Sequence, residues 1–218
     1  MTDVTQSLPH QLLLLEMDDF RGKSKISDSI LRGFGLAGAV VAELVWQQRL
    51  IPAKANRFVL NPDRPPTDGV LAMAETRLSE SKPRTLFQCI NRMKPNPMRK
   101  FLLNEMVEMG MLREENERLM IIIPRRRWYP GDNCPEESIV EHMRHYLEQA
   151  AHNTPPSRED LLLSLLRVTK LMGVIWEKEE LADLQETIEQ CTKRTPIGKD
   201  IHKAVQHAYA AMAAAAAS

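Results

Sequence analysis

Apolar and small residues recur at helical spacing over one long segment in the first quarter of the chain. The segment runs from Ile30 to Trp46, and its apolar positions follow one another at intervals of three or four. Because these positions surround much of the helix, we predict that it is a buried core helix. Gly35 and Gly38 lie within it and would permit close contact with a neighbouring helix.

Shorter segments with the same spacing predict further, amphipathic helices. Pro95 and Pro97 separate two of them, since proline disfavours continuation of a helix. Ser157, with Asp160 three residues later, resembles a capping box at the start of another core helix. The predicted helices cover residues 70–80, 83–93, 98–109, 135–151, 157–168, 179–192 and 196–209.

Residues 111–123 predict a β-hairpin. Two short apolar segments flank the polar run 113–118, which we interpret as the turn, and Gly110 suits the end of the preceding helix. Apolar and polar residues alternate weakly over residues 57–62, which predicts either a short strand or an extended connection. The predicted fold is therefore mainly α, a single globular domain of amphipathic helices around a buried core helix, with one β-hairpin.

The helical domain is predicted to span residues 9–209. Residues 1–8 form an N-terminal tail without the features of a secretory signal, and residues 210–218 form an alanine-rich tail that is either a fraying helix or disordered. No run of 18 apolar residues is present, so we expect no transmembrane helix.

The composition is that of a globular protein, with 43% hydrophobic and 27% charged residues in a chain of 218. Its three cysteines are widely spaced, which favours a reducing cytosol over a disulfide framework or structural zinc. They are Cys89, Cys134 and Cys191.

Charge is balanced overall but uneven along the chain. Lysine and arginine together number 29, as do aspartate and glutamate. Residues 84–127, however, carry ten basic side chains against five acidic ones. We expect these cations to gather on one outward surface that can face phosphate groups. Because the net charge is zero, no nucleic-acid partner is expected.

Motifs of catalysis and cofactor binding are weak. Gly33–Gly38 matches the spacing of a phosphate-binding loop, but it lies inside the predicted core helix, where small residues serve close packing. His142 and His145 share a helix face without an evident third metal ligand. No serine or cysteine stands in a recognisable nucleophile motif. We therefore expect no enzymatic activity, no metal and no cofactor.

One short segment combines cations with aromatic residues. Arg125, Arg126 and Arg127 precede Trp128 and Tyr129, a mixture that suits the headgroup region of a membrane. The alternative is a solvated turn whose rings cover the core. We predict that Arg125, Arg126, Arg127 and Trp128 form a membrane contact.

Several short segments follow one another in a recognisable order along the chain. They are 12–15, 19–22, 35–39 and 42–50, followed by 66–71, 102–112 and 161–166. None is specific alone, but their order and spacing resemble the Golgi phosphoprotein 3 family from about Pro9 to Tyr209.

The resemblance implies a helical fold with a projecting hairpin, and it also implies a function. Eukaryotic members are peripheral Golgi proteins that bind phosphatidylinositol 4-phosphate and hold the cytosolic tails of glycosyltransferases. A cytoplasmic protein, peripheral on a membrane and on the Golgi if the host is eukaryotic, is thus expected. Its partner would be an anionic phospholipid, with partner-protein tails and self-association as further options.

The family's lipid site carries over only in part. Its tryptophan falls at Ser27 or Asp28, and its three arginines fall at Ala37, Asn96 and Arg99. Only one of the four side chains is kept, which weakens bidentate phosphate capture. We predict a looser anion site made of Arg99, Lys100, Asn96, Arg32, Arg92 and Lys94.

Three functions remain open from the sequence. The first is a lipid-binding module, and the second is a protein-interaction module that has lost its lipid specificity. The third, favoured only by the helix followed by a hairpin, is a winged DNA-binding unit.

Overall fold

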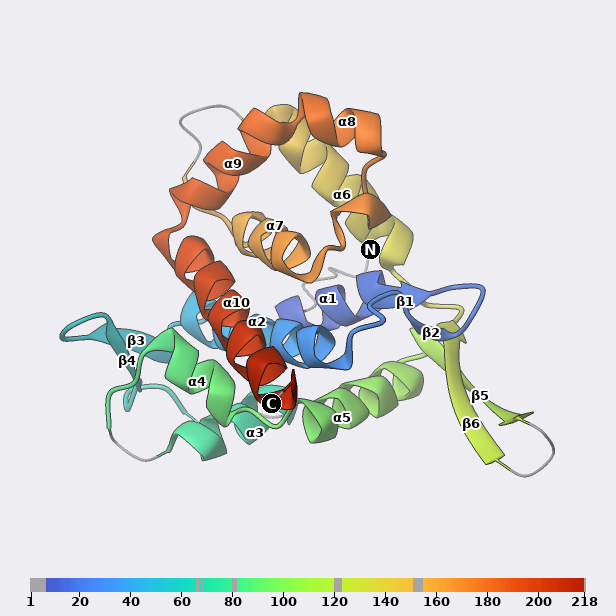
Figure 1. Ribbon diagram of the computed structural model, residues 1–218, viewed down its shortest axis with the longest axis horizontal. Coiled ribbons are helices and arrows are strands. Elements are labelled where there is room, and N and C mark those ends of the chain that lie inside the picture. The colour runs from blue at the N-terminus through green and yellow to red at the C-terminus, as the bar shows by residue number, and fades with distance from the viewer. Residues whose placement is uncertain are drawn as a thin grey trace.

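The computed structural model describes residues 7–65, 67, 69–79, 82–119, 123–150 and 155–217. Within these ranges the chain is mainly helical, as predicted (Figure 1). The helices are α1 (Leu8–Glu16), α2 (Ser29–Trp46), α3 (Gly69–Leu78), α4 (Leu86–Arg92), α5 (Pro95–Glu108), α6 (Glu136–Gln149), α7 (Arg158–Thr169), the 3-10 helix η1 (Met172–Val174), α8 (Lys178–Asp183), α9 (Gln185–Arg194) and α10 (Pro196–Ala217).

Three antiparallel pairs of strands accompany the helices in the described ranges. The pairs are β1 (Met17–Asp18) with β2 (Lys23–Ser24), β3 (Leu50–Ala53) with β4 (Arg57–Leu60), and β5 (Leu112–Leu119) with β6 (Ile123–Pro130). The sequence predicted only the last pair as a hairpin. Residues 57–62, for which the sequence allows a strand or an extended connection, contain strand β4.

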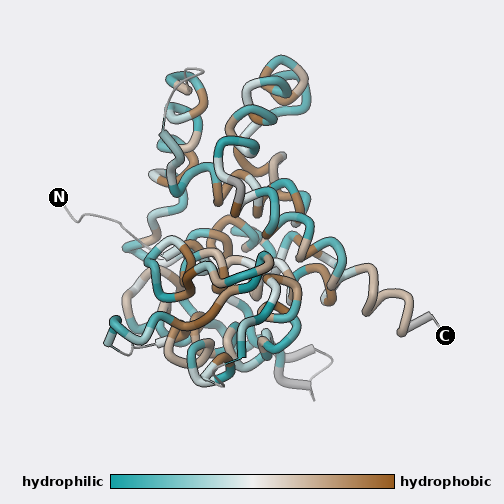
Figure 2. The backbone as a smooth tube through the Cα atoms, turned by 90° about the vertical axis from the view of Figure 1, so that its left-hand side faces the viewer, coloured by the Kyte–Doolittle hydropathy of each residue, from teal (hydrophilic) through white to brown (hydrophobic). Residues whose placement is uncertain are grey.

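Helix α2 is the core helix. It contacts α1, α3, α4, α5, α7 and α10, and its residues from Gly35 to Leu44 are buried. It is long and apolar enough to cross a membrane by length and composition, with a mean hydropathy of 1.4 over 18 residues, but 61% of that window is buried inside the protein. Figure 2 shows apolar segments gathered in the body of the molecule.

The two predicted glycine contacts are present. Gly35 faces Thr169 of α7, and a Cβ atom added to Gly38 would lie 2.5 Å from Val205 of α10. Any larger side chain at these positions would separate the helices, because the neighbouring atoms already occupy its place. The glycine spacing therefore serves packing, and Gly33–Gly38 is helical rather than a phosphate-binding loop.

The two prolines at the start of α5 act differently from the prediction. Pro95 begins α5 and Pro97 lies in its first turn, so the helix starts three residues earlier than expected. Proline is compatible with the first turn because the amide that it lacks has no partner within the helix. Thr85, for its part, caps the start of α4 by accepting a hydrogen bond from the Gln88 amide at 3.2 Å.

The predicted limits of the hairpin were wrong. The polar run 113–118, expected to be its turn, belongs to strand β5, and Arg125–Tyr129, expected to follow the hairpin, belongs to β6. Charged residues of the two strands pair across the ladder, as Arg126 does with Glu114 at 3.3 Å, and such pairs stabilise strands without apolar alternation. Residues 120–122 lie outside the described residues.

The C-terminal alanine segment is helical through Ala217, because α10 continues without a break. Figure 2 shows this end of the chain projecting from the body. The segment predicted as one helix at 179–192 is instead α8 and α9, which meet at Leu184. Parts of the predicted terminal tails, residues 1–6 and Ser218, lie outside the described residues. So do Pro66 and Asp68 of the segment 66–71, and Glu80 and Ala151 at the ends of two predicted helices.

Candidate functional site

A groove of about 330 Å³ lies between α5 and strand β6. Its α5 wall is one helix face, because the residues that line it are spaced by three or four along the helix. Its β6 wall consists of alternate residues of the strand, which point to the same side. The lining residues are Asn96, Arg99, Lys100, Leu103, Asn104, Arg126 and Trp128.

The groove brings together residues of two sites that are predicted separately from the sequence. Asn96, Arg99 and Lys100 belonged to the predicted headgroup site, whereas Arg126 and Trp128 belonged to the predicted membrane contact. Leu103 and Asn104 were not predicted to take part. Their spacing of seven and eight residues from Asn96, two turns along the same helix face, is the signal that would have identified them.

Arg99, the one family arginine that is kept, is held at the inner end of the groove. Its guanidinium forms a hydrogen-bonded ion pair with Glu16, whose carboxylate is 1% exposed, and Arg99 itself is 17% exposed. Burial raises the pKa of Glu16, while the charge of Arg99 opposes that rise. Most of the positive charge of Arg99 is therefore neutralised inside the protein.

Lys100 and Trp128 are better placed to meet a ligand. Lys100 is exposed and forms no ion pair with any described residue. The indole nitrogen of Trp128 is buried and has no hydrogen-bond acceptor among the described residues. Arg126 is half exposed and shares its charge with Glu114. The groove thus offers a cation and an indole donor without a partner.

The other predicted contact residues lie on the opposite face of the hairpin. Arg127 forms an ion pair with Glu117 at 3.1 Å and is 14% exposed, and the Tyr129 hydroxyl donates to the same carboxylate. Gly22, at the turn between β1 and β2, packs against Arg127 and Tyr129. Arg125 is exposed but shares this face, because strand residues alternate.

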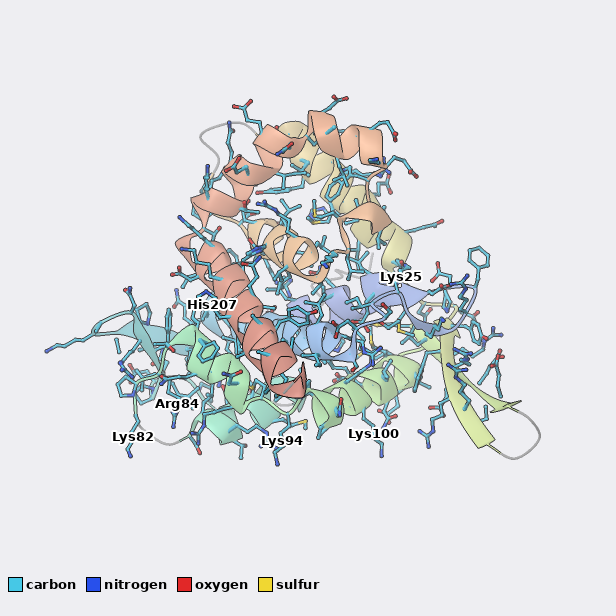
Figure 3. The ribbon with its side chains drawn as sticks, viewed as in Figure 1. Lys25, Lys82, Arg84, Lys94, Lys100 and His207 are labelled. Carbon is cyan, nitrogen blue, oxygen red and sulfur yellow. The ribbon has the colours of Figure 1, made fainter. Side chains whose placement is uncertain are left out.

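Three predicted headgroup residues do not line the groove. Arg32 donates to the Ile26 carbonyl at 3.4 Å and acts on the charge of Glu16. Lys94 precedes the first turn of α5 and is exposed. Arg92 lines a different hollow, with residues of α3. Figure 3 shows Lys94 and Lys100 along the same edge of the molecule.

The expectation that all basic residues of 84–127 form one outward surface is therefore wrong. Arg84 is 8% exposed, and Arg113 pairs with Glu115. With Arg99, Arg126 and Arg127 also paired, the positive charge that reaches solvent is concentrated at fewer positions. The reason is that Glu114, Glu115 and Glu117 of the segment, together with Glu16, lie within reach of its arginines once the chain has folded.

The remaining family positions are not part of the groove. Ala37 is 1% exposed within α2, where an arginine would be costly to bury. Asp28 caps the start of α2 by accepting hydrogen bonds from Ile30 and Leu31, and it also accepts one from the Tyr209 hydroxyl at 2.7 Å. These two positions serve helix packing and capping.

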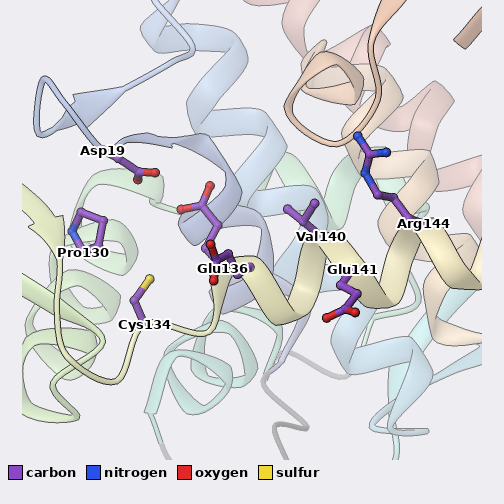
Figure 4. A pocket seen from close by; sticks show the side chains of 8 residues that line it. Asp19, Pro130, Cys134, Glu136, Val140, Glu141 and Arg144 are labelled. Carbon is purple, nitrogen blue, oxygen red and sulfur yellow. The ribbon is translucent and has the colours of Figure 1, made fainter. Parts of the chain in front are cut away.

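A second hollow, of about 580 Å³, lies beside the base of the hairpin (Figure 4). Its walls are mainly acidic. Burial raises the pKa of Glu136 to about 7, although Lys25 lies 3.2 Å from its carboxylate and opposes the rise. The lining residues are Asp19, Pro130, Cys134, Glu136, Glu137, Val140, Glu141 and Arg144.

Neither the histidines nor the cysteines form a reactive centre in the described part of the chain. No group of three or more metal-binding side chains occurs there. His142 pairs with Glu159 at 2.9 Å and His145 lies near Glu148. Burial raises the pKa of Cys89 to about 11, so its thiol is protonated at neutral pH and is a poor nucleophile.

Comparison with known proteins supports the resemblance seen in the sequence. A comparison with curated proteins gives no match. The family model described as Golgi phosphoprotein 3 (GPP34) matches residues 8–208, nearly the whole chain. This family is generally non-catalytic. The chain therefore belongs to the Golgi phosphoprotein 3 family.

Proposed function

We propose that this protein binds anionic lipid headgroups in the groove between α5 and β6, as a non-enzymatic peripheral membrane protein on the cytoplasmic side. The observation that carries the proposal is the pairing of unpartnered donors in one groove, the Lys100 ammonium and the Trp128 indole N–H. A phosphate oxygen would accept from both. Family membership supports phosphatidylinositol 4-phosphate as the lipid and the Golgi as the location if the host is eukaryotic.

The groove favours moderate rather than strict lipid selection. Asn96 stands where the family has an arginine, and Arg99 is engaged with Glu16. A bidentate arginine fork is therefore replaced by a point charge and neutral donors, which recognise phosphate with less geometric selectivity. Arg126 adds a cation at the rim, partly screened by Glu114.

Vesicle flotation tests this proposal. Wild-type protein is mixed at low salt with phosphatidylcholine vesicles, alone or with phosphatidylinositol 4-phosphate or phosphatidylserine. We expect binding to both anionic mixtures, and about a thirtyfold loss in the Lys100→Gln, Arg126→Gln double variant, since each of the two cations near a membrane contributes about 1 kcal/mol. Binding should also fall as salt screens the contacts.

A charge-matched control is available on α10, where Lys199 and Lys203 are exposed. The Lys199→Gln, Lys203→Gln variant removes the same charge without altering the groove, so it should bind like wild type. Equal loss in both double variants would show that net charge, not the groove, governs binding. No binding of wild type to any anionic vesicle would reject the proposal.

A second candidate function rests on the Arg99–Glu16 pair. If this pair has closed the ancestral anion site, the fold would instead hold the tail of a partner protein or associate with itself. A monomeric species in light scattering, with no stoichiometric partner in a pull-down, would speak against it.

A further inference from the structure

A third hollow, of about 550 Å³, lies where α3 and α4 end. Met73, Thr76 and Arg77 line it from one face of α3, because they are spaced by three and four residues. Ser79 follows α3, and Arg92 is the last residue of α4. None of these residues lines the groove between α5 and β6.

The two arginines of this hollow are held beside each other. Arg92 Nε donates to the backbone carbonyl of Arg77 at 3.2 Å, which fixes one guanidinium next to the other residue. Arg77 Nε is buried and has no hydrogen-bond acceptor among the described residues. A buried N–H group without an acceptor is costly, so an acceptor that enters the hollow would stabilise it.

The surroundings are also positive. Lys82 and Lys94 lie along the same edge of the molecule as this end of α3 and α4 (Figure 3). Glu75, the acid nearest to Arg77 along α3, is engaged by Arg49 and by the amide and hydroxyl of Thr67. Like charges gathered around one hollow are stabilised by a shared anion.

From this arrangement we propose that Arg77 and Arg92 form a phosphate-binding site, which we call the Arg77–Arg92 site. A small rotation of the Arg77 side chain would present Nε–H and one Nη–H together to two oxygens of a phosphate monoester. Arg92 meets the same phosphate from the other side, and the Ser79 and Thr76 hydroxyls stand at the rim. The dianionic charge of a phosphate monoester matches two guanidinium groups.

The test follows the arginine Nε–H signals of the full chain by proton–nitrogen NMR during addition of inorganic phosphate. The Arg77 signal is assigned by its absence from Arg77→Gln. We expect the Arg77 and Arg92 signals to shift saturably with phosphate but not with chloride. Arg92→Gln should weaken this response roughly tenfold, because one of two charged partners is lost.

Arg64→Gln is the control, since Arg64 is exposed and its guanidinium donates only to Gln48 Oε1 among the described residues. It should leave the phosphate response unchanged, and circular dichroism shows whether each variant is folded. An Arg77 signal that stays unmoved at about 10 mM phosphate, well above the range expected for a specific site, overturns the proposal.

Vesicles then identify the source of the phosphate. If it is a lipid headgroup, Arg77→Gln will lower flotation with phosphatidylinositol 4-phosphate but not with phosphatidylserine, which carries no phosphomonoester. If it is a soluble phosphate compound, flotation will be unchanged while the NMR response persists. The groove variant Lys100→Gln, Arg126→Gln should keep the response of the Arg77 signal to phosphate. Either proposal can therefore be rejected while the other stands.

Discussion

Two polar regions of this molecule differ in how completely their hydrogen bonds are satisfied. Around Asp160, which is 0% exposed, the carboxylate accepts from the Tyr146 hydroxyl at 2.7 Å, the Ser157 amide at 3.1 Å and the Thr195 hydroxyl at 3.2 Å. In the groove, the Trp128 indole N–H has no acceptor and Lys100 has no carboxylate among the described residues.

The difference separates structural from ligand-binding roles. A buried carboxylate with three donors ties α6, α7 and the start of α10 together, and it gains nothing from a ligand. A groove whose donors lack partners gains stability when an acceptor enters. Removing the hydrogen bonds around Asp160 should therefore lower the free energy of unfolding. Removing the donors of the groove should instead lower the affinity for anionic vesicles.

The largest effect is expected from Asp160→Ala. It leaves three donors without their acceptor, one buried and two half-buried, so we expect the free energy of unfolding to fall by about 3 kcal/mol. Urea denaturation measures the change. Thr192→Ala, at a less buried hydroxyl of the neighbouring α9, is the control and should cost less than about 1 kcal/mol. If Asp160→Ala lowers the free energy of unfolding no more than Thr192→Ala does, the contrast between the two regions is removed.

The next effect should come from Glu16→Gln, at the inner end of the groove. Removing one partner of a buried ion pair usually costs about 3–5 kcal/mol. Here we expect about 2 kcal/mol, because Arg99 is 17% exposed and can turn into the groove. The same variant should bind anionic vesicles more tightly than wild type. Unchanged or weaker binding would show that Arg99 cannot serve the groove.

Trp128→Phe tests the indole donor alone. The ring is kept, so we expect the free energy of unfolding to change by less than about 1 kcal/mol. Vesicle binding should weaken about fivefold, since one neutral hydrogen bond contributes about 1 kcal/mol. Trp46→Phe, at an exposed ring at the end of α2, is the matched control and should leave flotation unchanged. Wild-type binding by Trp128→Phe would exclude the indole N–H from ligand contact.

The smallest effect concerns pH and Glu136 in the acidic hollow. The folded pKa of about 7 lies above the ordinary glutamate value of 4.5, so the folded state binds more protons between these pH values. The stabilising contribution is complete below pH 4.5 and is lost as the pH rises through 7. We expect about 1 kcal/mol after solvent screening. Glu136→Gln should remove this dependence of the free energy of unfolding on pH. If the variant keeps the wild-type dependence, another group is responsible for it.

Periodicity alone was sufficient for most helices. The core helix at 30–46 and the helices beginning near 70, 136 and 158 lie close to their predicted positions, because buried apolar stripes and helix caps are local features of sequence. The hairpin was misplaced because its strands are stabilised by charge pairs between β5 and β6, and such pairs leave no apolar alternation to detect.

By itself, the sequence determined the helical class, the buried α2 with its two packing glycines, and the family, since each depends on short-range pattern or on the order of motifs. Only the tertiary structure decided which cations face solvent. Arg99 and Lys100 are neighbours in the chain, yet one is neutralised by Glu16 from 83 residues away and the other is exposed. Charge pairing depends on distances between segments, and those distances exist only after the chain has folded.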